Sequence, residues 1–487
     1  MRIIGFLVPF FFGLVGILSF APFSIKVFIF ISYAYLIYLI ISNDKNTLLK
    51  LFFWGAGHWG FGMSWIIVSV YYYGETTIAM SLVIFLLLVI TLSLVFTCPI
   101  YAISKLLNIS NFSNNFNKSL FISAMLMLIE FTRYYFLNGV PWLIPGNIFL
   151  DTLTQNIYSI LGVSATSLLI YLLCCNLVLN KKNKFSYVII FLMIISIVPD
   201  NKTEEINDGI KIAVVQPASD PFLKYKENYY YEIEQKILDL VTSVSKDTEL
   251  IVLPEAELPY SIQNERFDKF IDNLPNSEKI VMGAWNIEGN KLFNSIYSVN
   301  NKDLYKKVHL VPFGEYIPFI ENLRGLIRFF DLPMSNVTKG GKNQRNIMIL
   351  DDIEIASPIC FDIAFPETIR KMNKSSLLMI NISNDTWFGS SIGPYHHLEI
   401  ARIRSIENNR WTIRATNDGF SAIISNKGTI VSYLDKNISN TLEAKVKLIN
   451  LKSIYNKVGY LFAYIFTCLI IGIYLISIIW KKYKQSY

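Results

Sequence analysis

Charged residues are scarce in this sequence of 487 residues. Lysine, arginine, aspartate and glutamate make up 17% of it, whereas about a quarter is usual for soluble globular proteins. Hydrophobic residues make up 53% of the chain and are concentrated in residues 1–199 and 458–480. The segment between these two regions has the composition of a soluble domain. We therefore expect a membrane protein with one large aqueous domain.

Sequence signals for nucleotide, metal or nucleic-acid binding are also absent. No GxGxxG or P-loop pattern occurs. His58 has no second ligand at a suitable spacing, and His396 and His397 begin a helical pattern apart from any cysteine or aspartate ligand set. The net charge of +7 arises from basic residues at the ends of apolar runs, not from a basic block interleaved with aromatic residues. We expect no cofactor, no metal ion and no nucleic-acid partner.

Eight apolar stretches approach the length of about 20 residues that a membrane-spanning helix needs. Lysines cluster in every second connection between them, and the alternate connections carry almost none, Lys26 being the exception. Because basic residues collect on the cytoplasmic side, both termini are predicted to be cytoplasmic and residues 200–457 to lie outside the cytoplasm. The alternation also requires that the first stretch is retained and not cleaved as a signal peptide. The stretches are 3–20, 24–42, 50–73, 78–98, 119–137, 156–180, 185–199 and 458–480.

The soluble segment alternates β-rich runs with amphipathic helical patterns. The helical patterns cover residues 228–246 and 396–409. Apolar strands alternating with such helices predict an α/β domain whose sheets are covered on their faces. The β-rich runs begin at Ile210, Glu249, Lys279, Phe293, Ile353, Leu377 and Phe420.

The soluble segment contains a single cysteine, Cys360, and the other four cysteines lie in or beside the apolar stretches. Structural cysteines in an extracytoplasmic compartment normally form disulfides. An unpaired Cys360 is therefore either a reactive thiol or a small buried apolar residue. The cysteine count alone leaves both interpretations open.

Three predicted strand ends carry groups suited to acyl transfer. One strand ends at Glu255, a second stretch carries Lys307 and Glu315, and the run IEIASPIC ends at Cys360. A thiol at a strand-to-helix turn would have its thiolate favoured by the helix amides. A carboxylate could take the thiol proton, and an ammonium group could stabilise an oxyanion. Each group also has a structural alternative, because Glu255 and Lys307 could be ordinary surface charges.

The order of these groups resembles the Glu–Lys–Cys triad of the nitrilase superfamily. Longer motifs are similar to one membrane-embedded branch of it, the apolipoprotein N-acyltransferase family, and the resemblance covers essentially the whole chain. These motifs are KVHLVPFGEYIP (307–318), NDTWFGSSIGPYHHLEIARIRSIENNR (384–410), ATNDGFSA (415–422), FAPF (20–23) and NGVPWLIPG (138–146).

The resemblance implies an architecture and three domain boundaries. Residues 1–199 would form an N-terminal membrane domain of about seven transmembrane helices. Residues 200–457 would form a nitrilase-like αββα sandwich, and residues 458–487 a last transmembrane helix with a short basic tail.

The resemblance also implies roles for single residues. Glu255 would be the general base, Lys307 the cation that stabilises the oxyanion, and Cys360 the nucleophile. Strand alternation lets only one of Lys306 and Lys307 face the cysteine, and the eight-residue spacing to Glu315 selects Lys307. Glu315 would orient the lysine and the base.

Four further positions follow from the same comparison. Trp387 would line the entrance for the acyl chain or lipid, and Tyr225 would be a second substrate-binding residue. The family usually has tyrosine and glutamate directly after the nucleophile, where this chain has Phe361 and Asp362. Tyr225 stands where a tryptophan is typical.

The implied activity is phospholipid:apolipoprotein N-acyltransfer at the outer face of a bacterial inner membrane. A phospholipid would donate its acyl group to Cys360 as a thioester, and the α-amine of a diacylglyceryl-cysteine apolipoprotein would accept it, with the enzyme acting as a monomer. One alternative is a membrane-tethered amidase that uses the same triad. Another is a lipid-binding or transport protein whose working site is the intramembrane pair Glu130 and Arg133.

Overall fold

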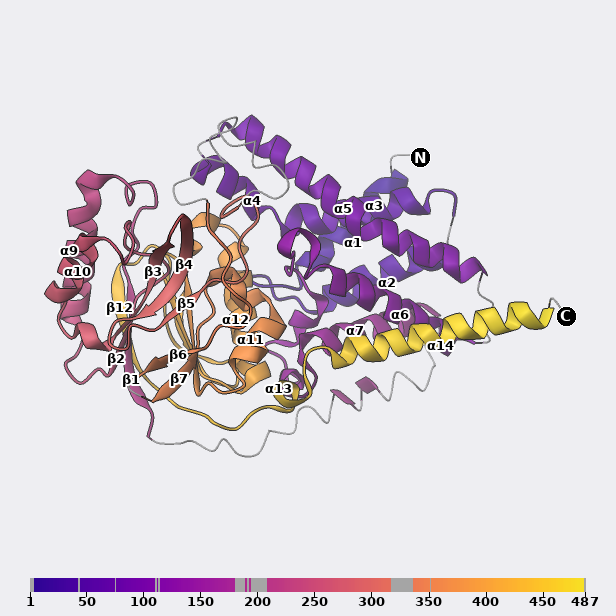
Figure 1. The fold of residues 1–487 in the computed structure, drawn as a ribbon. Coiled ribbons are helices and arrows are strands. Elements are labelled where there is room, and N and C mark those ends of the chain that lie inside the picture. The colour runs from indigo at the N-terminus through magenta and orange to yellow at the C-terminus, as the bar shows by residue number, and fades with distance from the viewer. Residues whose placement is uncertain are drawn as a thin grey trace. The chain divides into compact units, whose positions relative to one another are not determined.

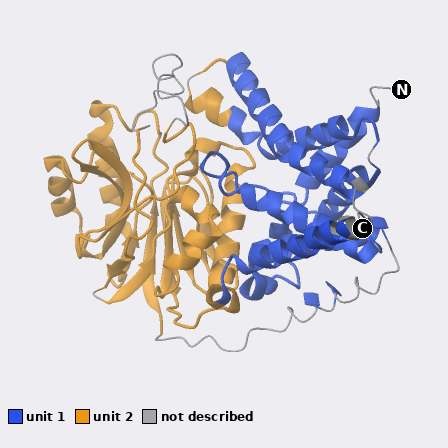
Figure 2. Cartoon of the chain, turned by 45° about the vertical axis from the view of Figure 1, so that its right-hand side comes forward, with its two compact units in different colours: residues 1–67, 78–200, 458–487 blue, residues 68–77, 201–457 orange. Residues whose placement is uncertain are grey.

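The computed structural model describes residues 4–42, 44–74, 76–109, 112, 114–179, 189–190, 192–193, 208–316, 336–350 and 352–485 (Figure 1). The chain forms two compact units (Figure 2). Unit 1 comprises residues 1–67, 78–200 and 458–487, and unit 2 comprises residues 68–77 and 201–457. The expected span 185–199 lies almost entirely outside the described residues.

Unit 1 consists of helices. Helix α3 packs against α1 and α5, α7 packs against α2 and α6, and α14 packs against α6. Two short 3₁₀ helices, η2 and η3, lie between α6 and α7, and α4 leads from unit 1 into unit 2. The bounds are α1 Ile4–Ile17, α2 Val27–Ser42, α3 Thr47–Gly62, α4 Trp65–Val68, α5 Ile78–Ile109, α6 Asn115–Thr132, η2 Phe136–Asn138, η3 Pro145–Phe149, α7 Ile157–Leu179 and α14 Phe462–Gln485.

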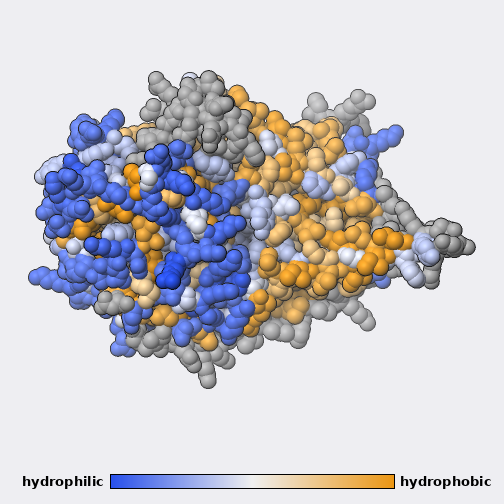
Figure 3. All heavy atoms as spheres, viewed as in Figure 1, coloured by the Kyte–Doolittle hydropathy of each residue, from blue (hydrophilic) through white to orange (hydrophobic). Residues whose placement is uncertain are grey.

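Helices α5 and α14 expose large apolar side chains along their length. Leu87 on α5 is 59% exposed and Ile476 on α14 is 68% exposed. Figure 3 shows hydrophobic side chains gathered over the helices of unit 1 and hydrophilic ones over unit 2. Among the described residues, Ile78–Leu107 and Ile157–Leu179 are long and apolar enough to cross a membrane, and three shorter apolar helices occur. Apolar surface of this extent suits contact with lipid better than contact with water.

The crossing of α1 and α3 depends on two glycines. A Cβ atom on Gly13 would collide with the backbone carbonyl of Trp54, and one on Gly57 would collide with that of Phe10. The two helix backbones can therefore approach each other closely only because these positions lack side chains. His58 beside them is 2% exposed and stacks on Trp54 with ring centroids 5.1 Å apart. It packs between helices, as the small residues around it predict.

Unit 2 contains two six-stranded sheets with the same order of pairings. Starting from β12 in one sheet and from β6 in the other, the successive pairs are antiparallel, parallel, parallel, antiparallel and antiparallel. The first sheet has the order β12-β1-β2-β3-β4-β5 and the second β11-β10-β9-β8-β7-β6. The bounds are β1 Ile210–Gln216, β2 Leu250–Val252, β3 Ile280–Glu288, β4 Lys291–Ser298, β5 Leu304–Lys306, β6 Ile347–Ile349, β7 Ile353–Ala356, β8 Leu378–Ser383, β9 Thr412–Thr416, β10 Ser421–Ile424, β11 Ile430–Leu434 and β12 Asn440–Val446.

The two sheets of unit 2 face each other, since β1 contacts β9 and β4 contacts β6. Helix α9 covers β1 and β12, while α11 and α12 cover β7 and β9 (Figure 1). The predicted αββα sandwich is confirmed. The helical bounds are η1 Ser69–Tyr73, η4 Glu227–Tyr229, α9 Tyr230–Ser243, α10 Glu265–Asn273, η5 Ser277–Lys279, η8 Cys360–Ala364, α11 Pro366–Met372, η9 Asp385–Phe388, α12 Gly393–Asn408 and α13 Ile454–Val458.

Helix α9 illustrates why these elements form. Its buried residues are Ile233, Ile237 and Val241, spaced four apart on one face. They join the apolar core against β1, β2 and β3, which includes Val215 and Ile251. Burying such a branched side chain stabilises a fold by about 1.5–3 kcal/mol, so this face fixes the helix on the sheet.

A short stretch of the N-terminal half belongs to unit 2. Residues 68–77 include η1, where the hydroxyl of Ser69 donates to the carbonyl of Trp387 at 2.7 Å. The ring of Tyr73 stacks on Phe222 with centroids 5.6 Å apart and meets Trp387 edge-on at 5.4 Å. The apolar stretch 50–73 of the sequence thus ends in contacts with the α/β unit.

The backbone at Gly283 on β3 leaves no room for a side chain. A Cβ atom there would lie 2.5 Å from both the Cα of Glu255 and the carbonyl oxygen of Pro254. We expect Gly283→Ala to lower the free energy of unfolding by about 1–3 kcal/mol, because backbone atoms cannot move aside cheaply. Thermal unfolding of the full chain in detergent measures the effect. Gly341→Ala is the control, because its nearest neighbour would be 3.9 Å away; equal unfolding temperatures for the two variants would contradict the close approach.

Candidate active site

Lys307 lies between two carboxylates at the end of β5. Its Nζ is 2.9 Å from Oε1 of Glu255 and 2.9 Å from Oε1 of Glu315. Lys307 is 2% exposed and Glu255 is 6% exposed. Buried charges are tolerated when they are paired and hydrogen-bonded. The fold brings these groups together from two distant parts of the chain. Glu255 follows β2, and Lys307 and Glu315 lie in the loop after β5.

Neutral donors complete the hydrogen bonding of the two carboxylates. The amide of Asn294 donates to Oε1 of Glu255 at 2.7 Å and to Oε1 of Glu315 at 3.2 Å. The backbone N–H of Asn384 donates to Oε2 of Glu255 at 2.8 Å, and that of Val311 donates to Oε2 of Glu315 at 2.8 Å. The sequence analysis missed Asn294 and Asn384 in this role. The two carboxylates are thus fixed in direction as well as position.

The environment keeps Lys307 charged. Burial by itself lowers the pKa of an ammonium group, but Glu255 and Glu315 raise the pKa of Lys307 well above its ordinary value, with Cys360 adding to the effect. Lys307 therefore remains a permanent cation at neutral pH. Its charge is available to a negative group that forms beside it.

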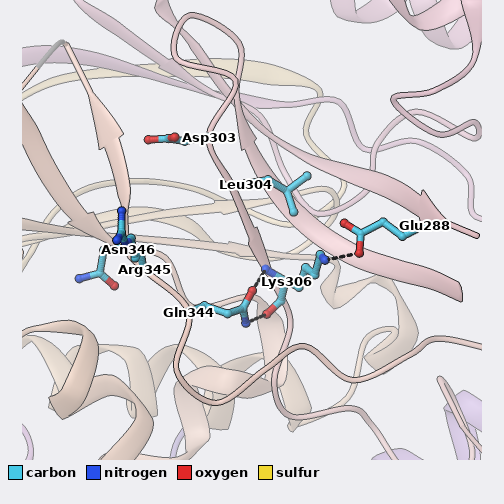
Figure 4. A pocket seen from close by; sticks show the side chains of 7 residues that line it. All are labelled: Glu288, Asp303, Leu304, Lys306, Gln344, Arg345 and Asn346. Carbon is cyan, nitrogen blue, oxygen red and sulfur yellow. Dashed lines mark hydrogen bonds and ion pairs between the residues drawn. The ribbon is translucent and has the colours of Figure 1, made fainter.

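The neighbouring Lys306 points away from this cluster. Its Nζ lies 2.6 Å from Oε2 of Glu288, and its backbone exchanges hydrogen bonds with the Gln344 side chain. Figure 4 shows these contacts in an open pocket of about 370 Å³ whose lining also includes Asp303 and Arg345. The expected choice of Lys307 over Lys306 by strand alternation agrees with this arrangement.

Cys360 begins the short helix η8 in a left-handed backbone conformation, with a φ of 46°. This conformation costs a residue with a side chain about 1–2 kcal/mol. Strand β7 ends at Ala356, so the expectation that the strand runs to Cys360 is wrong; only Ile359 makes an isolated bridge, to Ile382. A strained turn therefore presents the thiol.

Cys360 is partly exposed as a whole residue, and its thiol is buried among charged groups. Burial raises its pKa, the negative charge of Glu255 raises it further, and Lys307 lowers it by less. The net effect of burial and these charges therefore favours the protonated thiol, and an effect of the helix amides on the thiolate stays a prediction. Because the thiol keeps its proton, nucleophilic attack requires a base, and Glu255 is the carboxylate whose charge acts most strongly on the thiol.

Asp362 connects the cysteine turn to the lysine loop. Its carboxylate accepts from the N–H of His309 at 2.7 Å, of Ile359 at 3.3 Å and of Val308 at 3.5 Å. Its side chain is fully buried. Asp362 thus holds Val308 and His309, which follow Lys307, close to Ile359, which precedes Cys360. Its neighbour Phe361 is buried as well.

The two expected substrate-binding residues lie in the same unit. Trp387 is half-buried and follows Asn384, whose N–H binds Glu255, by three residues in η9. Tyr225 is half-buried, and burial raises the pKa of its hydroxyl. The ring of Tyr225 lies 5.8 Å from Nζ of Lys224.

Lys224 is a buried cation that the sequence analysis did not single out. It is 2% exposed, its Nζ donates to the carbonyl of Ala256, and it lies 4.0 Å from Oε2 of Glu257. Ala256 directly follows Glu255 and has a φ of 44°. Lys224 thus holds a left-handed residue beside the carboxylate of the site. No sequence motif predicted this contact.

His397 is also part of the site, although the sequence analysis considered it only as a possible metal ligand. Its Nε2 lies 3.2 Å from the carbonyl oxygen of Cys360 and its Nδ1 2.9 Å from Oδ1 of Asp385. Oδ2 of Asp385 accepts from Arg414 at 2.6 Å. The sequence analysis missed these contacts because only folding brings η9, α12 and β9 together. His396, next in the chain, is buried too.

In unit 1, the side chains of Glu130 and Arg133 contact different partners. Glu130 accepts from the hydroxyl of Tyr171 at 2.9 Å. Arg133 donates to the carbonyl of Trp142 and lies 4.8 Å from the ring centroid of Trp59. Both contacts tie neighbouring parts of unit 1 together, which gives the two charges a structural role.

Titration of Asp362 should affect stability near neutral pH. Burial raises its pKa from 3.8 to about 7, against the opposing effect of Lys307 and the backbone amides. As the pH rises from 3.8 to about 7, the unfolded chain loses this proton while the folded protein keeps it. The free energy of unfolding therefore falls over this range, and it falls no further above about pH 7. We expect the unfolding temperature of the wild type to fall relative to that of Asp362→Asn between these pH values.

Thermal unfolding at several pH values measures this difference. The control is Asp352→Asn at an exposed position, which should follow the wild type throughout. Parallel curves for the wild type and Asp362→Asn would contradict the raised pKa.

Comparison with known proteins adds evidence from outside the structure. Residues 211–455 match the carbon-nitrogen hydrolase family, and residues 12–176 match the apolipoprotein N-acyltransferase N-terminal domain. The apolipoprotein N-acyltransferase of Pasteurella multocida is 30% identical over 478 residues, which cover 91% of this chain and 90% of the relative. That of Haemophilus influenzae is 30% identical over 480 residues, covering 92% and 90%. That of Haemophilus ducreyi is 27% identical and covers 95% of both chains.

Proposed function

The chain belongs to the apolipoprotein N-acyltransferase family, and from this membership and the site geometry we propose that it is a phospholipid:apolipoprotein N-acyltransferase. The observation that carries the proposal is the buried cluster in which Glu255 and Glu315 hold Lys307 beside the thiol of Cys360. A cysteine, a carboxylate and a fixed cation are the groups that acyl transfer through a thioester needs.

The first half-reaction loads the enzyme. The carboxylate of Glu255 takes the thiol proton of Cys360 as its sulfur attacks the ester carbonyl of a phospholipid. The ammonium group of Lys307 stabilises the oxyanion. The tetrahedral intermediate then breaks its bond to the glycerol oxygen, which receives the proton from Glu255 and leaves as a lysophospholipid. The acyl group remains on Cys360 as a thioester.

The second half-reaction transfers the acyl group. The free α-amine of a diacylglyceryl-cysteine at the start of an apolipoprotein attacks the thioester carbonyl, and Glu255 takes a proton from that amine. Lys307 again stabilises the oxyanion. The Cys360 sulfur leaves and is reprotonated, and the apolipoprotein carries an amide-linked third chain. Asp362 and Glu315 support the reaction by holding the lysine loop and Lys307.

Membrane attachment suits these substrates. Each buried CH₂ of an acyl chain costs about 0.8 kcal/mol to withdraw from a bilayer, so an enzyme beside the membrane avoids a large barrier. The exposed apolar faces of α5 and α14 support a membrane location. We propose that the Trp387 region receives the acyl chain, with Tyr73 and Phe222 extending its aromatic surface.

The charge alternation gives a proposed topology of eight spans with both termini in the cytoplasm. It places the connection around residues 74–77 on the same side of the membrane as residues 200–457. The grouping of residues 68–77 with residues 201–457 in unit 2 supports that topology. The catalytic unit would then lie on the periplasmic face of a bacterial inner membrane.

Intact-mass analysis tests the thioester directly. Purified full-length protein incubated with a defined diacyl phospholipid should gain one acyl group. The same treatment of Cys360→Ala should give no gain, and hydroxylamine or a diacylglyceryl peptide should remove the group from the wild type. A folded wild type that gains no mass would instead favour a small-amide hydrolase, which hydrolysis of short amides without lipid would reveal.

Substitution of the lysine tests the oxyanion role. We expect Lys307→Ala to slow acylation of Cys360 by at least about 10²–10³, the usual loss when one oxyanion donor is removed. Lys306→Ala is the matched control, because Lys306 pairs with Glu288 on the other side of the strand and should leave acylation within a few-fold of wild type. Near-normal acylation by Lys307→Ala would refute the role.

A further inference from the structure

The carbonyl group of Cys360 accepts a hydrogen bond from a side chain of another element. Cys360 holds a left-handed φ of 46°, and a strained turn keeps such a conformation only where neighbouring groups fix it. On the side towards α12, Nε2 of His397 lies 3.2 Å from the carbonyl oxygen of Cys360. A carbonyl oxygen can only accept, so this ring nitrogen must carry hydrogen.

The ring of His397 is itself held in place. Its Nδ1 lies 2.9 Å from Oδ1 of Asp385, which also accepts from the hydroxyl of Ser383 at 2.7 Å. Oδ2 of Asp385 accepts from Arg414 at 2.6 Å. Asp385, His397 and Arg414 are each at most 1% exposed. Arg414 and His397 lower the pKa of Asp385 well below its usual range despite its burial, so the acceptor stays charged.

The same strand end also holds the base. The N–H of Asn384 donates to Oε2 of Glu255 at 2.8 Å, and the next residue is Asp385, which anchors His397. The turn after β8 therefore contacts the carboxylate of Glu255 directly, and it contacts the turn at Cys360 through the imidazole of His397. Its backbone sets the position of base and nucleophile relative to each other.

We propose that His397, oriented by Asp385 and Arg414, is a positioning residue that holds Cys360 in its attacking conformation through the Nε2–H hydrogen bond to its carbonyl. The proposal rests on the acyltransferase function proposed above. Without this bond the thiol is displaced from Glu255, and a displacement of about 1 Å is enough to slow a reaction about 10²-fold. Packing of α12 is the simpler role that the test has to separate from positioning.

Glutamine and asparagine at position 397 separate these two roles. The terminal nitrogen of glutamine occupies nearly the place of Nε2 in histidine, and that of asparagine nearly the place of Nδ1. Both variants lose the ring, but only His397→Gln can still donate to Cys360. His396→Gln is the matched control on the same helix, at a position 3% exposed.

The variants are tested as full-length protein in detergent. Acylation by a diacyl phospholipid is followed by intact mass over time at several lipid concentrations, and alkylation of Cys360 by iodoacetamide and thermal unfolding are measured beside it. We expect His397→Asn to acylate about 10²-fold more slowly at saturating lipid with an unchanged KM. His397→Gln should lie within about 10-fold of wild type, and His396→Gln within about 2-fold. Equal losses in the Gln and Asn variants, or none in the Asn variant, would overturn the proposal.

A measurement on the unaltered protein covers the case in which a variant fails to fold. The chain has only 4 histidines, so ¹⁵N-histidine labelling gives few signals, and the signals that survive in each of His58→Gln, His309→Gln and His396→Gln belong to His397. We expect a protonated Nε2 in the resting enzyme. An unprotonated Nε2 would refute the hydrogen bond whatever the variants do. Wild-type protein that alkylates at Cys360 but never acylates would sink the proposed function, whereas His397→Asn that acylates normally would sink only this inference.

Discussion

The contact of the buried ammonium group of Lys307 with the carboxylates of Glu255 and Glu315 organises unit 2. Lys307 cannot be withdrawn from water unless Glu255 and Glu315 are present. The two carboxylates in turn need donors to replace their hydration: Asn294 serves both, Asn384 serves Glu255 and Val311 serves Glu315. These requirements fix β4 and the ends of β2, β5 and β8 against one another. Burial and the negative charge of Glu255 raise the pKa of the Cys360 thiol, which explains why it keeps its proton until a substrate arrives.

Two turns of the candidate site share a second constraint. Ala256 and Cys360 both adopt left-handed backbone conformations, and in each case a buried basic side chain donates to the carbonyl of the strained residue, Lys224 at Ala256 and His397 at Cys360. A buried basic group could not remain there without partners, and Glu257 and Asp385 supply them. The backbone strain is thus maintained by side chains from other elements and not by the turn itself.

The sequence predicts the layer architecture and the groups at the strand ends, because apolar runs and long motifs mark them directly. It does not predict contacts made by backbone amides, such as that of Asn384, since any residue type supplies an N–H. His397 escaped detection because Asp385 and Arg414 lie on different elements, and nothing in their spacing indicates that they meet. The turn at Cys360 was missed because a positive φ is usually found at glycine. Strands β5 and β6 were missed because each has three residues, which is too short for a periodic pattern.

The membership of residues 68–77 in the α/β unit has a consequence for how the protein can be made. A fragment restricted to residues 201–457 would lack Ser69 and Tyr73, and it would leave Phe222 and Trp387 without their partners. Expression of residues 201–457 alone should therefore yield an aggregation-prone protein with an incomplete fold. During synthesis, residues 68–77 are made more than a hundred residues before residues 201–457, with which they pack. Residues 68–77 can therefore reach their final contacts only after the later segment has been made.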